Sequence, residues 1–190
     1  GNDIIDIEET KRSTNWERPG FLEKIFTSRE QEFIRASADP FTTVWLLWSM
    51  KESAYKIVIQ TGAERSFNPS RFECDLESLE NGRVRMHDRT FKTTTKIDSN
   101  YVFTTASFGN SEFENRVFKI IEKGSEYQSA FMQEKVLKAF LKHNALKRSE
   151  LKIQKTKTGV PKLFYKNKVL NRSFSIAHHG KYGAYSIGLL

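Results

Sequence analysis

The chain has 190 residues and carries 31 lysine and arginine residues against 23 aspartate and glutamate residues, a formal net charge of +8. Its 38% hydrophobic and 13% aromatic content is typical of a folded, water-soluble protein and argues against disorder. No apolar run approaches the roughly 20 residues that a membrane-spanning helix needs. The single cysteine, Cys74, excludes a disulfide within the chain, and no secretory leader pattern opens the sequence, so we expect a reducing, cytoplasmic setting.

The positive charge is concentrated in the C-terminal part of the chain. Residues 1–110 have a net charge of −2, whereas residues 111–190 have a net charge of +10. The surplus is densest over residues 135–172, where twelve basic residues accompany one acid, Glu150. Any single lysine there is best explained as a solvated surface residue. The cluster as a whole predicts an anionic partner: a phosphate-bearing ligand, a nucleic acid or an acidic protein.

The first sixty residues predict a strand followed by helices. Residues 3–7 indicate a short strand, and a charged, turn-prone stretch follows as far as Gly20. The sequence Thr27-Ser28-Arg29-Glu30 has the form of a capping box, so a helix should begin there and end near Pro40. The apolar spacing over residues 43–60 predicts the longest buried helix of this half.

From residue 67 the apolar period shortens and predicts about four strands, over residues 71–76, 83–86, 91–97 and 101–107. Asn81-Gly82 predicts a turn before the second of these strands. After residue 110 the helical period returns and predicts a short helix over residues 113–121 and a longer one over residues 131–141. Four more strands are then expected, at residues 151–153, 162–164, 174–176 and 182–189.

The two halves share an order of elements. In each half a glycine turn is followed later by a terminal strand that begins with tyrosine, Tyr101 in one half and Tyr182 in the other. We therefore expect an α+β protein of two related lobes, a pseudo-dimer in which each lobe packs an antiparallel sheet with helices. The expected division is residues 1–109 and 110–190, together forming one unit.

Three short segments contain residues that could carry chemistry. Asp3, near a glycine at a strand start, could face a hard cation, although an isolated acid in this pattern is better explained as a surface turn residue. Glu52 and Lys56 lie four apart on one helix face, the spacing of an ordinary surface pair. Their largely apolar surroundings instead favour a bound cation or phosphate. His178 and His179 adjoin on a strand and so point to opposite faces, which makes a zinc site improbable.

These segments together resemble the 4′-phosphopantetheinyl transferase superfamily. Residues 1–7 (GNDIIDI) are similar to the G-x-D-I-V-E-I opening of holo-acyl-carrier-protein synthases, and residues 21–27 (FLEKIFT) to the helix entry that follows it. Residues 48–56 (WSMKESAYK) match W-[ST]-x-K-E-[SA]-x-x-K, the most specific motif of the set. Residues 159–161 (GVP) and 174–178 (FSIAH) resemble the G-K-P…F-N-I-S-H segment of the larger, surfactin-synthetase-activating type. Relative to that type, the two halves stand in exchanged order.

The resemblance implies the transfer of 4′-phosphopantetheine from coenzyme A to a serine of an acyl or peptidyl carrier protein, with release of 3′,5′-ADP. Asp3 and Glu52 would hold Mg²⁺ with the pyrophosphate of coenzyme A, and Glu52 would be the catalytic base. Coenzyme A would be bound by Lys51, Lys56, His178 and Lys162, and Lys56 would also stabilise the departing group. A holo-acyl-carrier-protein synthase would serve fatty acid biosynthesis or a related pathway, and two lobes on one chain imply a monomer.

The sequence departs from the family pattern at three positions. Ile5 occupies the place of a second acid, which leaves the third metal ligand open to Asp6 or water. Val160 replaces the lysine of G-K-P, and Ala177 replaces the serine before the histidine. Two alternatives therefore stay open: a family member that binds coenzyme A without turnover, and a nucleic-acid-binding module that uses the basic residues 135–172.

Overall fold

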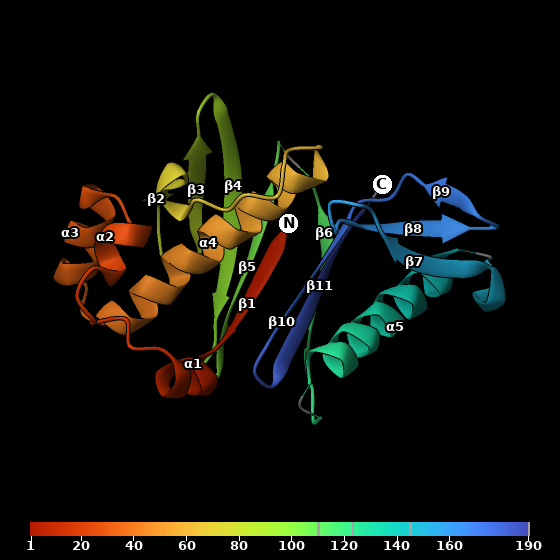
Figure 1. Ribbon diagram of the computed structural model, residues 1–190, viewed down its shortest axis with the longest axis horizontal. Helices are drawn as coiled ribbons and strands as arrows, with labels where there is room; N and C mark the ends of the chain where they lie inside the picture. The colour runs from red at the N-terminus through yellow and green to blue at the C-terminus, as the bar shows by residue number, and fades with distance from the viewer. Residues whose placement is uncertain (110, 123, 145, 190) are drawn as a thin grey trace.

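Two lobes lie side by side and meet along strands that are distant in the sequence (Figure 1). The structure is a computed structural model that describes residues 1–109, 111–122, 124–144 and 146–189. We call the described residues up to 109 the first lobe and those from 111 onward the second lobe. Among the described residues, no helix is long and apolar enough to cross a membrane.

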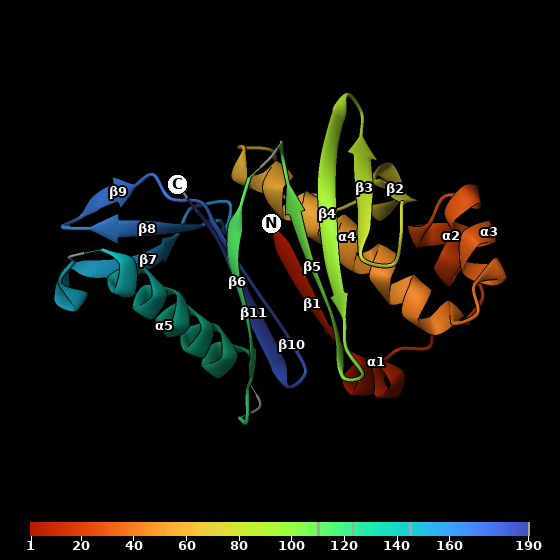
Figure 2. The same ribbon diagram turned by 180° about the vertical axis from the view of Figure 1, so that it is seen from behind.

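The first lobe is an antiparallel sheet covered on one face by a long helix. The sheet order is β1-β5-β4-β3-β2, with strands β1 (Asn2–Asp6), β2 (Glu73–Leu76), β3 (Asn81–Met86), β4 (Arg89–Ile97) and β5 (Tyr101–Ser107). Helix α4 (Pro40–Gln60) packs against β1 and β5, and no helix of the described residues covers the opposite face of the sheet, seen in Figure 2. The apolar core of this lobe lies between α4 and the sheet.

Three short helices precede α4: α1 (Ile7–Ser13), α2 (Phe21–Ile25) and α3 (Ser28–Ala36). The capping box predicted at the start of α3 is confirmed, because Thr27 Oγ1 accepts from the Glu30 backbone N–H and Glu30 accepts from the Thr27 N–H. Helices α1 and α2 fall in a stretch expected to be turns and the start of a helix. Asp6 caps α1 through its Oδ1, which accepts a hydrogen bond from the Glu9 N–H.

The second lobe packs one long helix, α5 (Ser125–His143), against two small sheets. One sheet has the order β10-β11-β6, with β6 (Phe113–Lys119), β10 (Phe174–His179) and β11 (Tyr182–Gly188). The other has the order β7-β8-β9, with β7 (Leu151–Lys155), β8 (Pro161–Tyr165) and β9 (Lys168–Leu170). Helix α5 contacts β7, β10 and β11, and the core of this lobe lies beneath it.

The lobes join through a small shared core. Ile4 and Phe103 of the first lobe pack with Ala177 and Ala184 of the second, all at most 6% exposed. Strand β1 lies against β10 and β11. Tyr101 and Tyr182, the residues that begin the two corresponding strands, have ring centroids 5.2 Å apart. The α+β class is confirmed, and each lobe has the expected antiparallel sheet and long helix.

The short helix predicted over residues 113–121 is wrong, because residues 113–119 form strand β6. This strand pairs with β11 along its whole length, from Phe113 opposite Gly188 to Lys119 opposite Tyr182. The apolar residues Phe113 and Val117 fit a helical spacing, but they are also an even number of residues apart, as on one face of a strand. The spacing therefore fits a helix and a strand, and the segment forms a strand because it pairs with the edge of β11.

The turn predicted at Asn81-Gly82 is also wrong, because both residues begin β3. The chain reverses earlier, where the Asn81 carbonyl accepts from the N–H groups of Glu77 and Ser78. A Cβ atom at Gly82 would lie 2.9 Å from the Met50 methyl group of α4 and 2.8 Å from the Asp75 carbonyl oxygen. The glycine is therefore required for close packing of the helix on the sheet, and not for a turn.

Candidate active site between the lobes

A cleft of about 850 Å³ opens where β1, α4 and the end of β10 meet. Asp3 comes from β1, Glu52 from α4, and His178 and His179 from β10, and all four line the cleft. The packing of α4 on β1 sets the positions of the two carboxylates, and the contact of β1 with β10 adds the histidines from the other lobe. Residues about 50 and 175 positions apart in the sequence therefore share one cavity.

Lys56 ties β1 to α4 at the floor of this region. Its ammonium group donates to the Asn2 carbonyl oxygen at 2.8 Å and lies 3.4 Å from Asp3 Oδ1. The side chain of Asp3 is 13% exposed, and its other oxygen, Oδ2, is buried without a hydrogen-bond partner among the described residues. A buried carboxylate oxygen without a partner is costly, so a ligand that supplies positive charge would stabilise it.

Asp3 is close enough to Glu52 to influence the ionisation of Glu52. Burial, and after it the negative charge of Asp3, raises the pKa of Glu52 to about 7, while Lys56 and Arg65 oppose the shift. Burial also raises the pKa of Asp3, against the effect of Lys56. Two carboxylates with raised pKa values in one cleft form a site that favours a divalent cation.

His178 lies between the cleft and a second, smaller cavity. Its Nδ1 is 3.0 Å from Gln128 Oε1 of α5. Burial, followed by the charges of Lys56, Lys155 and His179, lowers the pKa of His178. Lys56 and Lys155 are therefore close enough to His178 to act on a phosphate group that the ring contacts.

The second cavity, of about 240 Å³, is cationic. It is lined by three charged residues from both lobes, Lys56, Arg65 and Lys155, and its described lining residues include no carboxylate. Gly159, in a turn with a φ of +77°, lies so close to the Arg65 guanidinium that a Cβ atom there would collide with it. A turn that only glycine suits at this point lets Arg65 reach across to the second lobe.

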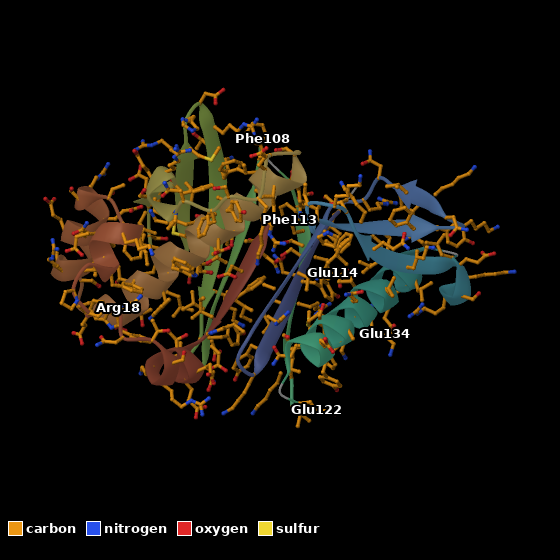
Figure 3. The ribbon with its side chains drawn as sticks, in the orientation of Figure 1. Arg18, Phe108, Phe113, Glu114, Glu122 and Glu134 are labelled. Carbon is orange, nitrogen blue, oxygen red and sulfur yellow. The ribbon has the colours of Figure 1, made fainter. Side chains whose placement is uncertain are left out.

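The far part of the large cleft is apolar with a basic rim. Phe21, Trp45 and Trp48 form its wall, and the Trp45 ring makes edge-on contacts with both of the other rings. Arg18 and Lys24 line the same cleft, and Figure 3 labels Arg18 on the segment that joins α1 to α2. This part suits an uncharged chain that carries polar groups at its outer end.

Comparison with known proteins adds a family to this geometry. Residues 1–107, more than half of the chain, match the family model described as the 4′-phosphopantetheinyl transferase superfamily. The chain belongs to this superfamily. Asp3, Glu52 and Lys56, three of the residues expected from its motifs, all lie in the matched part and meet at the site described above.

Two relatives match shorter stretches. A holo-[acyl-carrier-protein] synthase of Caldanaerobacter subterraneus subsp. tengcongensis is 40% identical over 58 residues, which cover 30% of this chain and 45% of the relative. A holo-[acyl-carrier-protein] synthase of Chlamydia muridarum is 32% identical over 73 residues, which cover 38% of this chain and 58% of the relative. The chain thus spans about half the length of the curated relatives it matches.

Lys51, expected to bind coenzyme A from the transferase motif, has a structural place instead. Its side chain is fully buried, and its ammonium group lies 2.8 Å from Glu30 and donates to the carbonyl oxygens of Pro69 and Phe72. The adjacent motif residue Glu52 faces the cleft because successive helix positions are rotated by about 100°. The expectation for Lys51 is therefore corrected: it holds α3 and the segment before β2 against α4.

The structure locates the other sequence candidates differently. Lys162 is not among the described residues that line either cavity, and Lys155, which the sequence reasoning missed, lies beside His178 instead. Strand alternation explains this result. Lys155 lies opposite Pro161 on the paired strand, and Lys162 is the next residue after Pro161. Successive strand residues point to opposite faces of a sheet, so the two lysines lie on opposite faces. Only the pairing of β7 with β8 shows which lysine of this basic stretch faces the site.

The three departures from the family pattern acquire structural roles. Ile5 belongs to the core of the first lobe, Val160 is 3% exposed at the wall of the cationic cavity, and Ala177 packs in the core between the lobes. Asp6 is not among the described residues that line the cleft, and its two oxygens accept backbone hydrogen bonds from Glu9 and Lys181. Within the described residues, no group of three or more histidine, cysteine, aspartate or glutamate side chains is arranged to hold a metal.

Proposed function

We propose that the protein transfers the 4′-phosphopantetheine group from coenzyme A to a serine of an apo carrier protein and releases 3′,5′-ADP. One observation carries the proposal: the paired carboxylates Asp3 and Glu52 open onto the same cleft as His178, which also lines a cavity of three cations. A pyrophosphate needs cations around its oxygens and an acceptor hydroxyl needs a base, and this site offers both within one region.

Asp3 and Glu52 fit a magnesium ion. Their donors are carboxylate oxygens, which Mg²⁺ prefers, and Asp3 Oδ2 is buried without a hydrogen-bond partner in the described part of the chain. Mg²⁺ takes few protein ligands and keeps several waters, so two carboxylates suffice when substrate phosphate completes the shell. When bound, the ion would neutralise charge on the phosphoryl group under attack.

The protein's own groups then have separate tasks. Lys56, Arg65 and Lys155 bind the phosphates of coenzyme A, and His178 contacts them from the second lobe. Glu52, whose pKa is raised to about 7 when no metal is bound, takes the proton from the serine hydroxyl. The serine oxygen forms a bond to the phosphorus that carries the pantetheine arm, the bond from this phosphorus to 3′,5′-ADP breaks, and Lys56 stabilises the departing phosphate.

The apolar wall of the cleft supports the placement of the rest of the substrate. The pantetheine arm is an uncharged chain, and it fits along Trp45, Trp48 and Phe21. Arg18 and Lys24 at the same cleft are suitable contacts for an acidic carrier protein. A cytoplasmic location and a role in fatty acid biosynthesis accord with this reaction.

The test is a mass-shift assay with coenzyme A, Mg²⁺ and a panel of apo carrier proteins. We expect one carrier to gain the mass of one phosphopantetheine group, and Glu52→Gln to lower the rate at least about a hundredfold, because the base and one metal ligand are lost together. Lys155→Met should raise the KM for coenzyme A about tenfold through loss of a charged contact. Lys162→Met, the matched control from the neighbouring strand, should leave it within about twofold.

The alternatives give different results in the same experiment. Binding of coenzyme A without a mass gain on any carrier would indicate a family member that binds coenzyme A without turnover. No binding of coenzyme A, together with a steep loss of nucleic-acid affinity as salt rises, would favour the nucleic-acid-binding module on residues 135–172.

A further inference from the structure

Gln128 of α5 joins His178 to the turn that follows β10. The residue is 8% exposed, its Nε2 donates to the Gly180 carbonyl oxygen at 2.8 Å, and its Oε1 lies 3.0 Å from His178 Nδ1. None of the transferase motifs in the sequence contains this residue. It is nevertheless the one described side chain that forms a hydrogen bond with the His178 ring.

The bond to Gly180 determines which way the amide of Gln128 points. A backbone carbonyl only accepts hydrogen bonds, so the group facing Gly180 must be the amide nitrogen, and the oxygen must face His178. An amide oxygen also only accepts, and therefore His178 Nδ1 must carry a proton. The other ring nitrogen, Nε2, takes part in no hydrogen bond among the described residues and is left for a ligand.

His179 is held in the opposite way. Its Nδ1 lies 3.0 Å from the Asp6 backbone nitrogen, whose N–H can only donate. His179 Nδ1 must therefore be without a proton, and the neutral ring carries its proton on Nε2. Two adjacent histidines thus have opposite tautomers, each imposed by a different partner across the structure.

We propose that Gln128 is a positioning residue that fixes the ring orientation and the Nδ1–H tautomer of His178, so that Nε2 is presented to the phosphate of coenzyme A. The identity of the ligand in this inference rests on the proposed function, but the tautomer of His178 does not depend on it. A phosphate oxygen accepts hydrogen bonds, so the ring binds it with both nitrogens protonated: Nδ1–H donates to Gln128 and Nε2–H donates to the phosphate. Gln128 Oε1 accepts the hydrogen bond from Nδ1–H whether the ring is neutral or positively charged.

The charges around His178 agree with a neutral ring in the ligand-free protein. Burial lowers its pKa, and the charges of Lys56 on α4 and Lys155 on β7 lower it further. An anionic ligand in the cavity would oppose the same cations. We therefore expect the His178 ring to be neutral before the ligand binds.

The test is nuclear magnetic resonance of the histidine rings in the ligand-free protein, above the pH at which they titrate. Long-range proton–nitrogen spectra should show Nδ1–H for His178 and Nε2–H for His179. Gln128→Leu should move His178 to the Nε2–H form that free histidine favours and leave His179 unchanged, while Gln128→Glu, which keeps an acceptor, should retain Nδ1–H. The matched control is Gln31→Leu on α3, which removes the same kind of bond, from Gln31 Nε2 to the Phe26 carbonyl, in the other lobe.

An Nε2–H tautomer for His178 in the unchanged protein would overturn the inference, and so would an Nδ1–H tautomer that persists in folded Gln128→Leu. If Gln128→Leu does not fold, the unchanged protein and Gln128→Glu still decide the matter. In the transfer assay, Gln128→Leu should raise the KM for coenzyme A about tenfold with kcat changed by less than about threefold, because a contact to bound substrate is misaligned. The spectra need no coenzyme A, so their failure is separate from a failure of the proposed reaction.

Discussion

At Glu52, burial and a neighbouring carboxylate act in the same direction. Both disfavour the ionised side chain, and together they raise its pKa from 4.5 to about 7. A residue with these properties is useful as a base near neutral pH, but it destabilises the folded protein whenever it is ionised. The proposed catalytic role and a stability cost therefore have one physical origin.

This cost can be measured by comparing unfolding of the protein and of Glu52→Gln in urea, with metal removed by a chelator. The folded state binds the Glu52 proton more tightly than the unfolded state, so the unchanged protein loses stability as pH rises from about 4.5 to about 7. We expect Glu52→Gln to be more stable by about 1–3 kcal/mol at pH 8 and equally stable near pH 4. A constant difference at both pH values would contradict this account.

Magnesium provides the complementary measurement. If Asp3 and Glu52 hold the ion, Mg²⁺ should raise the unfolding temperature of the unchanged protein, because it binds only the folded site. Glu52→Gln should show less than about half of that shift, since one ligand is lost. Sodium chloride at the same ionic strength serves as the control for general salt effects.

Lys51 illustrates a charged residue whose role is decided by its surroundings. Removal of Lys51 leaves Glu30 buried at 3% exposure with an uncompensated charge. Lys51→Met should lower the free energy of unfolding by about 3–5 kcal/mol, and Lys51→Met combined with Glu30→Gln should cost less than the two changes added. At a temperature where the variant is folded, its KM for coenzyme A should be unchanged, whereas a rise of about tenfold would restore Lys51 as a binding residue.

At the scale of elements, the turn between β10 and β11 links both lobes to the site. Asp6 Oδ2 accepts from the Lys181 N–H in this turn, His179 accepts from the Asp6 N–H, and Gln128 donates to Gly180. Gly180 has a φ of +56°, and a Cβ atom there would collide with the Asp6 carboxylate. The turn thus sets the position of β1 relative to β10. Through Asp6, it also sets the position of the N-terminus of α1.

Gly180→Ala tests this turn. We expect it to lower the free energy of unfolding by about 2–4 kcal/mol, because it adds backbone strain and also displaces Asp6 from its two hydrogen bonds. Gly62→Ala is the matched control, since Gly62 also has a positive φ but open space around its Cβ position. It should cost only about 1 kcal/mol. Equal losses in the two variants would show that the contact with Asp6 contributes nothing.

At the scale of the whole molecule, the cavity that contains the site is formed by two lobes of one chain. The lobes bury Ile4, Phe103, Ala177 and Ala184 against each other, and each contributes cations to the smaller cavity. The site therefore needs no second copy to supply His178 or Lys155.

We expect this chain to be a monomer in solution. Light scattering or sedimentation should give a mass near the 22.1 kDa of one chain across a wide range of protein concentration. The physical reason is that β1 already packs against β10 and β11 of its own chain, so this face is not free for a partner. A mass of three subunits would contradict the expectation.

Much of this architecture could be predicted from local sequence. The capping box at Thr27 and Glu30, the long helix that ends at Gln60 and the strand that begins at Tyr101 each depend on residues near one another in the chain. The motif around Glu52 and Lys56 likewise depends on a helical repeat of about 3.6 residues. Patterns of this kind report which side of an element is apolar, and they do so without any knowledge of its neighbours.

Other features were decided only when distant segments met. Residues 113–119 form a strand because they pair with the edge of β11. Lys51 is buried in an ion pair with Glu30, which belongs to another helix. Lys155 faces the site because of the register in which β7 pairs with β8. The tautomers of His178 and His179 depend on Gln128 and Asp6, 50 and 173 positions away. By itself the sequence determined the types of residue and their local spacing, whereas the charge state and direction of each side chain depend on tertiary contacts, because burial and hydrogen-bond partners are properties of the folded surroundings.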